Sequence, residues 1–259
     1  MTSAHVNEGR LIGKRMSRKE DARLLTGRGT FVDDVVLPGM LHVAFVRSPI
    51  ARGRIRSIDI SSARDLPGVL AVLTAKDLDP SNVKLLSFFF TPAMSVPVPL
   101  LARDSVAYVG DPVAMVVAQD RYIAEDAAGL VTVDYEEEEP VVTIADAKRA
   151  PPVHSGMDSN VAAVMGIEKD DDLEEVLASA PYLLTRTVRH QRLCQSPMET
   201  RGVLATKQGD ELLVYVTCQS PHLVARYLSL ALDKPQLSVR VIAKDVGGGF
   251  GLKNHPWRE

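Results

Sequence analysis

The chain has 259 residues, of which 46% are hydrophobic and 24% are charged, and its formal net charge is −3. A chain of this length can bury a sizeable core, in one large domain or in two ordinary ones. Its Lys and Arg residues are scattered rather than gathered into a stripe, which argues against a nucleic-acid-binding protein.

No targeting signal or membrane span is expected from the sequence. Residues 1–18 are polar and lack the apolar run of a signal peptide. Residues 85–102 carry no charge, but three prolines among them exclude a continuous membrane helix and favour an extended loop. Cys194 and Cys218 form no CxxC pair, which is typical of reduced thiols and predicts a cytoplasmic protein.

The first half of the sequence alternates short predicted strands with short predicted helices. Strands are expected where apolar residues recur at every second position, and helices where polar caps and turn residues bound a short segment. In chain order we expect a strand at 40–47, a strand at 54–60, a short helix at 61–66, a strand at 69–73, a helical turn at 74–78, a central strand at 113–118, a helix at 121–129 and a strand at 130–135.

Four consecutive glutamates at 136–139 follow the last of these strands. They suggest acid–base or metal chemistry, but adjacent residues of an extended chain point to alternate faces and no histidine is near. We interpret them as a solvated edge. The proline-rich stretch at 140–152 then marks a boundary, with a first domain expected at 1–142, a linker at 143–150 and a second domain at 151–259.

The second part of the sequence predicts longer strands and one amphipathic helix. Strands are expected at 182–191, 202–206, 211–217 and 237–242. The helix begins at Ser220-Pro221, with serine as N-cap and proline in the first turn. Its apolar face is expected to hold Leu223, Val224, Tyr227, Leu228 and Ala231.

Four glycines in five positions follow the last strand, in the sequence Gly247-Gly-Gly-Phe-Gly251. Glycine lets the backbone turn sharply and approach another group closely. A dinucleotide fingerprint fails because its third glycine falls on Leu252, and a P-loop fails because Lys253 stands one position too late. The amides of 247–251, with Phe250 as a fixed wall, are therefore a candidate platform for an anionic or metal–oxo ligand. A tight turn packed under another domain is the alternative.

Several collinear motifs carry a resemblance to a known family. The second part of the chain has Ser196-Pro-Met-Glu-Thr-Arg-Gly202, Thr217-Cys-Gln-Ser-Pro-His222 and Asp245-Val-Gly-Gly-Gly-Phe-Gly-Leu-Lys253. The first part has matching stretches at 23–34, 45–51 and 108–113. On these motifs the chain resembles the large molybdopterin-binding subunit of the xanthine dehydrogenase and aldehyde oxidase family. The resemblance implies an α+β fold, with the family's a/b hammerhead domain followed by the first, incomplete segment of its molybdopterin-binding region.

The same resemblance implies the residues that face the cofactor. Gln219 matches a glutamine beside the molybdenum oxo group, and Gly249, Phe250 and Gly251 match a loop that contacts the cofactor near the metal; no direct metal ligand is expected. An amide NH2 group can donate to an oxo ligand, and a helix beginning at Ser220 adds its positive end. A helix-cap or surface role is the alternative for Gln219.

Four further residues have expected roles. Glu199 and Arg201 are expected to form a buried pair that supports the sheet, and His222 is expected to be structural or to lie behind the site. Asn254 stands where purine-oxidising relatives carry a substrate-binding glutamate, which argues against a purine substrate.

The resemblance implies a molybdenum hydroxylase that places water-derived oxygen on an aldehyde or heteroaromatic carbon. It implies a molybdenum–molybdopterin cofactor in the cytosine dinucleotide form, and partner chains with iron–sulfur clusters and FAD. Family subunits continue well beyond the glycine loop and carry their general-base glutamate there, so we expect this chain alone to be inactive and its catalytic base to lie beyond Glu259. The alternative is a non-catalytic binding or assembly module, or a remnant, that docks on other subunits. Either reading predicts an exposed apolar patch within 182–242.

Overall fold

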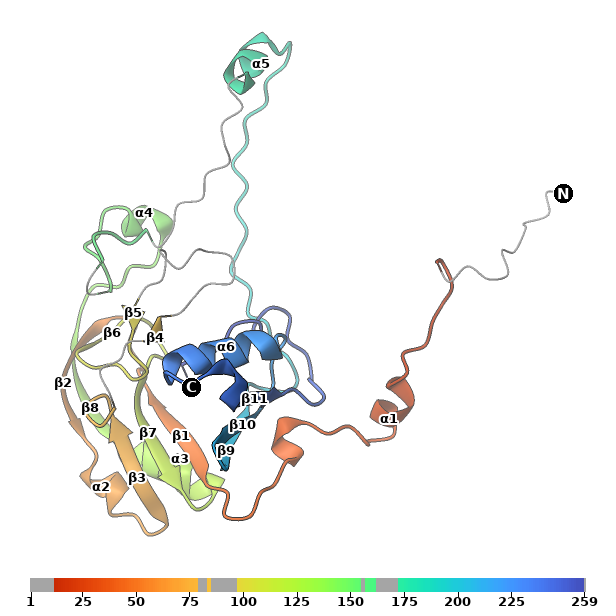
Figure 1. The fold of residues 1–259 in the computed structure, drawn as a ribbon. Helices are drawn as coiled ribbons and strands as arrows, with labels where there is room; N and C mark the ends of the chain where they lie inside the picture. The colour runs from red at the N-terminus through yellow and green to blue at the C-terminus, as the bar shows by residue number, and fades with distance from the viewer. Residues whose placement is uncertain (1–11, 79–82, 85–96, 155–156, 162–171, 259) are drawn as a thin grey trace.

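The structure is a computed structural model that describes residues 12–78, 83–84, 97–154, 157–161 and 172–258 (Figure 1). Most of the uncharged stretch 85–102 and most of the polar segment 1–18 lie outside these residues. Helices and strands are mixed along the chain, as predicted. No helix among the described residues is long and apolar enough to cross a membrane.

The central strand of the first sheet is the one with the most continuous apolar sequence. Strand β7 (Pro112–Ala118) pairs antiparallel with β1 (His42–Arg47) on one side and with β3 (Val69–Thr74) on the other. Five of its seven residues are buried, because it is covered on both faces. Helices α2 (Ser61–Arg64) and α3 (Arg121–Leu130) supply Ala63 and Ala127 to a core that also holds Val72 and Val116.

A second antiparallel sheet covers the opposite side of β7. Its strands are β6 (Ser105–Val106), β2 (Gly53–Asp59) and β8 (Thr132–Glu137), in the order β6-β2-β8. Val113 of β7 packs there with Ala102 and Val106. The predicted solvated edge is confirmed: Glu136 pairs with Arg56, and Glu138 pairs with Arg52 and Arg54. The described residues contain no cluster of three or more His, Cys, Asp or Glu that could hold a metal ion.

The third sheet contains one parallel pair of strands. Its order is β11-β10-β9, from β9 (Val203–Gln208), β10 (Glu211–Val216) and β11 (Val239–Ile242). Strand β10 pairs antiparallel with β9 and parallel with β11, so the chain crosses over between β10 and β11 through α6 (Pro221–Ala231) and the 3-10 helix η3 (Gln236–Ser238). Helix α6 lies along this sheet in Figure 1 and buries Val224 and Tyr227.

Smaller elements complete the described chain. They are α1 (Asp21–Leu25), the 3-10 helix η1 (Val32–Asp34), the two-stranded pair β4 (Val83–Lys84) and β5 (Pro97–Val98), α4 (Ile144–Ala147) and α5 (Leu173–Ser179). Residues 75–78 form a turn closed by hydrogen bonds from Thr74 to Asp77, rather than the predicted helical turn. Ala231, placed on the apolar face of α6 by its spacing, is exposed because it ends the helix.

The strand predicted at 182–191 is not formed. Residues 181–196, which we call the arm, run extended from α5 toward β9, and Figure 1 shows α5 far from the three sheets. Among the described residues, the arm makes no backbone–backbone hydrogen bond to another segment. A strand is defined by its ladder, so the alternating sequence of the arm alone does not make one.

Candidate functional site at the carboxyl ends of two parallel strands

The parallel pairing of β10 and β11 decides where the site forms. The carboxyl ends of parallel strands meet at one edge of a sheet, and ligands of such sheets bind outside that edge. Gln219 lies three residues after β10, and the glycine loop, which we define as residues 245–253, lies three residues after β11. Segments more than 20 residues apart in sequence are therefore neighbours in space.

The structure brings the four predicted residues together. The backbone N–H of Gly251 donates to Oε1 of Gln219 at 3.0 Å. A Cβ atom on Gly249 would stand 2.4 Å from the same oxygen, so a larger residue there would have to displace the Gln219 side chain. Phe250 lies between these two glycines. Glycine at 249 therefore lets the Gln219 side chain pack directly on the loop backbone.

Gln219 presents a free donor to solvent. Its side chain is exposed, and its Oε1 is occupied by Gly251. Within the described part of the chain, neither its Nε2 group nor the backbone N–H groups of Gly248, Gly249 and Phe250 has a hydrogen-bond partner. The predicted platform of five amides was too broad, because the amides of Gly247 and Gly251 are occupied by the protein itself. The available donors are three amides and one NH2 group.

Phe250 has a backbone conformation that is rare for a residue with a side chain. Its φ is 49°, and 73% of its surface is exposed. Its ring folds back over Gly248, where an added Cβ would be 2.9 Å from the ring. The loop is closed locally by a 2.8 Å hydrogen bond from Leu252 N–H to the carbonyl of Gly249. An exposed aromatic ring held in a costly conformation is typical of a binding loop rather than of a packing turn.

One carboxylate behind the loop collects three donors. Oε2 of Glu199 accepts from Gly247 N–H at 2.7 Å, from Lys253 Nζ at 2.9 Å and from Thr217 Oγ1 at 3.0 Å. Burial raises the pKa of Glu199, but these hydrogen bonds and the charge of Lys253 outweigh it and lower the pKa below its ordinary value. An ionised carboxylate with three donors is a poor proton acceptor, so Glu199 does not fit the role of a base.

The predicted partner of Glu199 was wrong. Glu199 pairs with Lys253, whose side chain is fully buried, and Arg201 instead lies 4.4 Å from the ring centroid of Trp257. Arg201 was predicted as the partner of Glu199 because it is two residues away in the same motif. Lys253 lies beside Glu199 because the glycine loop folds back toward it. Lys253 points inward to a carboxylate, which also removes it as a phosphate-binding lysine.

The entrance to the loop is clamped by the N-terminal segment. The guanidinium of Arg23 forms two hydrogen bonds with the carboxylate of Asp245, one of them at 2.7 Å from Nη2 to Oδ1. Thr30 N–H also donates to Asp245 at 2.7 Å, and Asp245 N–H donates back to the carbonyl of Thr30 at 3.0 Å. The bonds from Arg23 and Thr30 lower the pKa of Asp245 to about 2.

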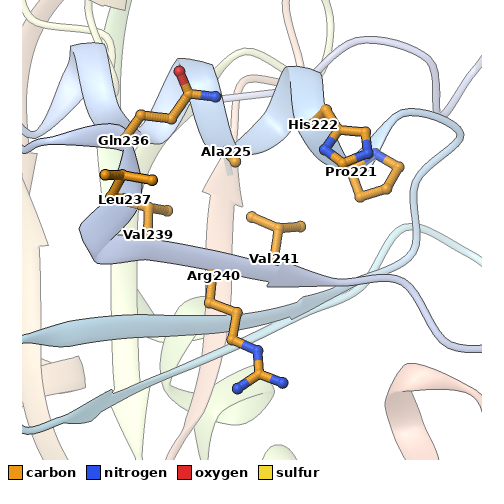
Figure 2. Close-up of a pocket in the computed structure, with 8 residues that line it drawn as sticks. All are labelled: Pro221, His222, Ala225, Gln236, Leu237, Val239, Arg240 and Val241. Carbon is orange, nitrogen blue, oxygen red and sulfur yellow. The ribbon is translucent and has the colours of Figure 1, made fainter.

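The first turn of α6 differs from its prediction. Ser220 is the N-cap, but its hydroxyl makes no capping hydrogen bond; it lies 3.4 Å from Oδ1 of Asn254. His222 is exposed and lines a groove of about 430 Å³ between α6 and β11 (Figure 2). This groove is lined by Pro221, His222, Ala225, Gln236, Leu237, Val239, Arg240 and Val241, and it includes neither Gln219 nor the glycine loop. His222 faces this groove, and its structural role or its place behind the site stays a prediction.

Two family descriptions match separate parts of the chain. Residues 26–139 match the family "Aldehyde oxidase and xanthine dehydrogenase, a/b hammerhead domain". Residues 153–259 match the family "Molybdopterin cofactor-binding domain", and this match contains Glu199, Gln219 and the whole glycine loop.

Known relatives agree with both matches. The nicotine 6-hydroxylase large subunit of Paenarthrobacter nicotinovorans is 39% identical over 96% of this chain, and the carbon monoxide dehydrogenase large chain of Hydrogenophaga pseudoflava is 37% identical over 92%. The crystal structure of quinoline 2-oxidoreductase from Pseudomonas putida 86 superimposes on 95% of the chain with a TM-score of 0.83 and 36% identity. The chain spans 31% of the length of the two curated relatives and 32% of the quinoline enzyme's chain.

Proposed function

Because the chain belongs to the aldehyde oxidase and xanthine dehydrogenase family of molybdenum hydroxylase large subunits, we propose that it forms one wall of a molybdopterin cofactor site. The observation that carries this proposal is the Gln219 amide. Gly251 holds its Oε1, so its Nε2 faces solvent beside three backbone N–H groups that have no partner among the described residues. Unoccupied N–H donors in one loop and its neighbour fit an oxygen-rich, electron-rich group.

The residues of this chain contribute position and polarity. Gln219 donates a hydrogen bond from Nε2, the amides of Gly248, Gly249 and Phe250 donate from the loop, and the Phe250 ring excludes water from one side. The molybdenum group, when bound, supplies the redox chemistry. The proton acceptor that such a hydroxylation needs is proposed to lie outside residues 1–259.

Finer features of the whole enzyme are part of the same proposal. The relatives are named as a large subunit and a large chain, which supports an assembly with other chains, and we propose partners that carry iron–sulfur clusters and FAD. The proposed cofactor is the cytosine dinucleotide form, the proposed substrate is an aldehyde or heteroaromatic compound, and the proposed location is the cytoplasm. Cys194 and Cys218 are free thiols, which agrees with that location.

The test is a binding measurement on the purified chain. Molybdenum cofactor released from a purified molybdenum hydroxylase is added anaerobically, and the molybdenum retained after gel filtration is measured by mass spectrometry. We expect the wild type to retain it and Gln219→Ala to bind at least about tenfold more weakly, because a charged or oxo acceptor loses its side-chain donor. Gln208→Ala, on the exposed edge strand β9, is the matched control. Equal retention by the Gln219 and Gln208 variants would overturn the proposal.

A second candidate is a non-catalytic module that docks on other subunits. The exposed apolar side chains of the arm favour it, since Tyr182 is 94% and Leu193 is 78% exposed, and the groove of Figure 2 adds an open surface of mixed polarity. If the wild-type chain retains no molybdenum, the result favours the docking module over the cofactor site. A chain that retains molybdenum but does not oxidise an aldehyde with a dye acceptor supports the proposed wall of an incomplete site.

A further inference from the structure

Glu199 connects two parts of the site that do not touch each other directly. Gly247 and Lys253 stand near the two ends of the glycine loop, and both donate to the same oxygen, Oε2 of Glu199. The carbonyl of Gly247 in turn accepts from Glu199 N–H at 3.3 Å. The seven-residue segment 247–253 is thus closed into a ring by hydrogen bonds to one carboxylate.

The same ring holds Gln219 at two points. The carbonyl of Lys253 accepts from Gln219 N–H at 2.9 Å, which fixes the backbone of Gln219 relative to the end of the loop. Gly251 N–H fixes the side-chain amide through Oε1. Thr217, the third donor to Glu199, is two residues before Gln219 and is buried. Gln219 is therefore held by Lys253, which donates to Glu199, and by Gly251, which lies in the loop between Gly247 and Lys253.

We propose that Glu199 is a positioning residue that sets the direction of the Gln219 amide and the spacing of the free loop amides. This inference rests on the proposed function, because the direction of Nε2 matters only if a ligand accepts from it. Glu199 does not itself face the ligand. Its Oε2 lies behind the loop, and its Oε1 is buried without a hydrogen-bond partner in the described part of the chain.

The charge of Glu199 is essential to this role. The Lys253 side chain is fully buried, and a buried ammonium is stable only beside an opposite charge. A carboxylate oxygen also accepts several strong hydrogen bonds at once, whereas an amide oxygen of the same shape offers weaker ones. Glu199→Gln therefore keeps the shape and removes the charge that holds Lys253 and Gly247 on one atom.

The test measures Gln219 at a distance from the substitution. In the purified, cofactor-free chain, the 15N-labelled side-chain amide of Gln219 is identified by its loss in Gln219→Ala. We expect Glu199→Gln to shift and broaden this signal and to speed hydrogen exchange at Gly251 N–H by about tenfold or more. Gly251 is the decisive amide because it donates to Gln219 and not to Glu199. A purely local support role would speed exchange at Gly247 alone.

Two further variants keep the test decisive. Glu125→Gln removes an exposed carboxylate on α3 and is the charge-matched control, with no expected change at Gln219. Thr217→Val removes one donor and leaves the ion pair, so a smaller shift in the same direction is expected even if Glu199→Gln does not fold. If Glu199→Gln folds, an unchanged Gln219 signal and unchanged Gly251 exchange in that variant overturn the inference. If Glu199→Gln does not fold, the same result in Thr217→Val overturns it.

A failure of the proposed function can be told apart from a failure of the positioning role of Glu199. Molybdenum retention by the wild type tests the site, whereas the Gln219 and Gly251 signals are read without cofactor. If the wild type retains molybdenum and the Gln219 and Gly251 signals depend on Glu199, Glu199→Gln is expected to retain cofactor about tenfold less well than Glu125→Gln. If the wild type retains none but Gly251 exchange still depends on Glu199, the positioning holds and the assignment of the ligand is wrong.

Discussion

At the scale of single residues, the glycines of the loop are required for different reasons. A Cβ on Gly249 would displace the Gln219 side chain, because Gln219 Oε1 and Cδ lie 2.4 and 2.7 Å from that position. Gly251 has room, but its φ of 91° is a backbone conformation that other residues avoid. The sequence shows four similar glycines, and only the structure separates a contact requirement from a conformational one.

Alanine substitutions should separate these two requirements. We expect Gly249→Ala to displace the Gln219 side chain and to cost about 1–3 kcal/mol of unfolding free energy through overpacking. Gly251→Ala should cost about 1–2 kcal/mol through backbone strain. Gly129→Ala, in α3 with open space around it, should instead stabilise the chain by about 0.5–1 kcal/mol. Urea unfolding measures all three, and a neutral Gly249→Ala would contradict the observed contact.

The clamp between Arg23 and Asp245 predicts a pH dependence. The pKa of Asp245 is lowered to about 2 from an ordinary value of 3.8, so its ionised form is favoured by folding. Its contribution to stability is therefore complete above about pH 4 and is lost as the pH falls through about 2. The difference in Tm between wild type and Asp245→Asn should shrink over that window. Asp210→Asn, in an exposed turn, should show no such change, and a constant difference for Asp245→Asn would exclude the clamp.

At the scale of elements, the arm at 181–196 is a weakly protected segment. Its residues are exposed throughout, and its backbone lacks the hydrogen bonds of a strand. Arg186 and Arg192 donate only to the carbonyls of Thr185 and Val142, each a single contact to an exposed partner. Local opening of such a segment costs little free energy.

Limited proteolysis should therefore cleave the arm before it cleaves the sheets. We expect trypsin to cut after Arg186, Arg189 and Arg192 at least about tenfold faster than after Arg54 or Arg56 of β2, since cleavage there requires unfolding of a sheet. Mass spectrometry of the early fragments identifies the sites. In a variant with the three arm arginines changed to glutamine, trypsin should spare the arm while chymotrypsin still cuts after Tyr182. Early cleavage within β2 would refute this order.

At the scale of the whole molecule, the last described residue ties the C-terminal segment to the first sheet. Arg258 contacts Asp111 beside β7, and both side chains are about 95% buried. It also donates to Tyr108 Oη at 2.6 Å and to the carbonyl of Pro99 at 2.8 Å. A buried ion pair therefore joins residues of the first and second predicted domains.

Removing one partner of this pair should be costly. Arg258→Met leaves the Asp111 carboxylate buried without its counter-charge, for which we expect a loss of about 3–5 kcal/mol in unfolding free energy. Arg240→Met, at an exposed arginine of β11, is the matched control and should change stability by less than about 0.5 kcal/mol. Urea unfolding at neutral pH gives both values. A loss for Arg258→Met no larger than the control's would show that the pair contributes little.

The sequence alone was sufficient for much of the fold, and its family resemblance named four residues that the structure brings together. Period-two apolar spacing located β1 and β2, and short continuous apolar runs located β3 and β7, because both signals depend only on neighbours along the chain. The motifs around Gln219 and the glycine loop likewise named the residues that the structure brings together. Both are local signals, readable without knowing what lies beside them.

Tertiary structure decided the rest. The arm alternates like a strand, yet it is not one, because strand formation needs a partner that its own sequence does not contain. The true partner of Glu199 is Lys253, 54 residues away, and the donors left free are three amides of the loop rather than five. These outcomes follow from the parallel pairing of β10 and β11, which places distant segments at one edge of the sheet. Local sequence spacing does not predict which distant segments will be neighbours.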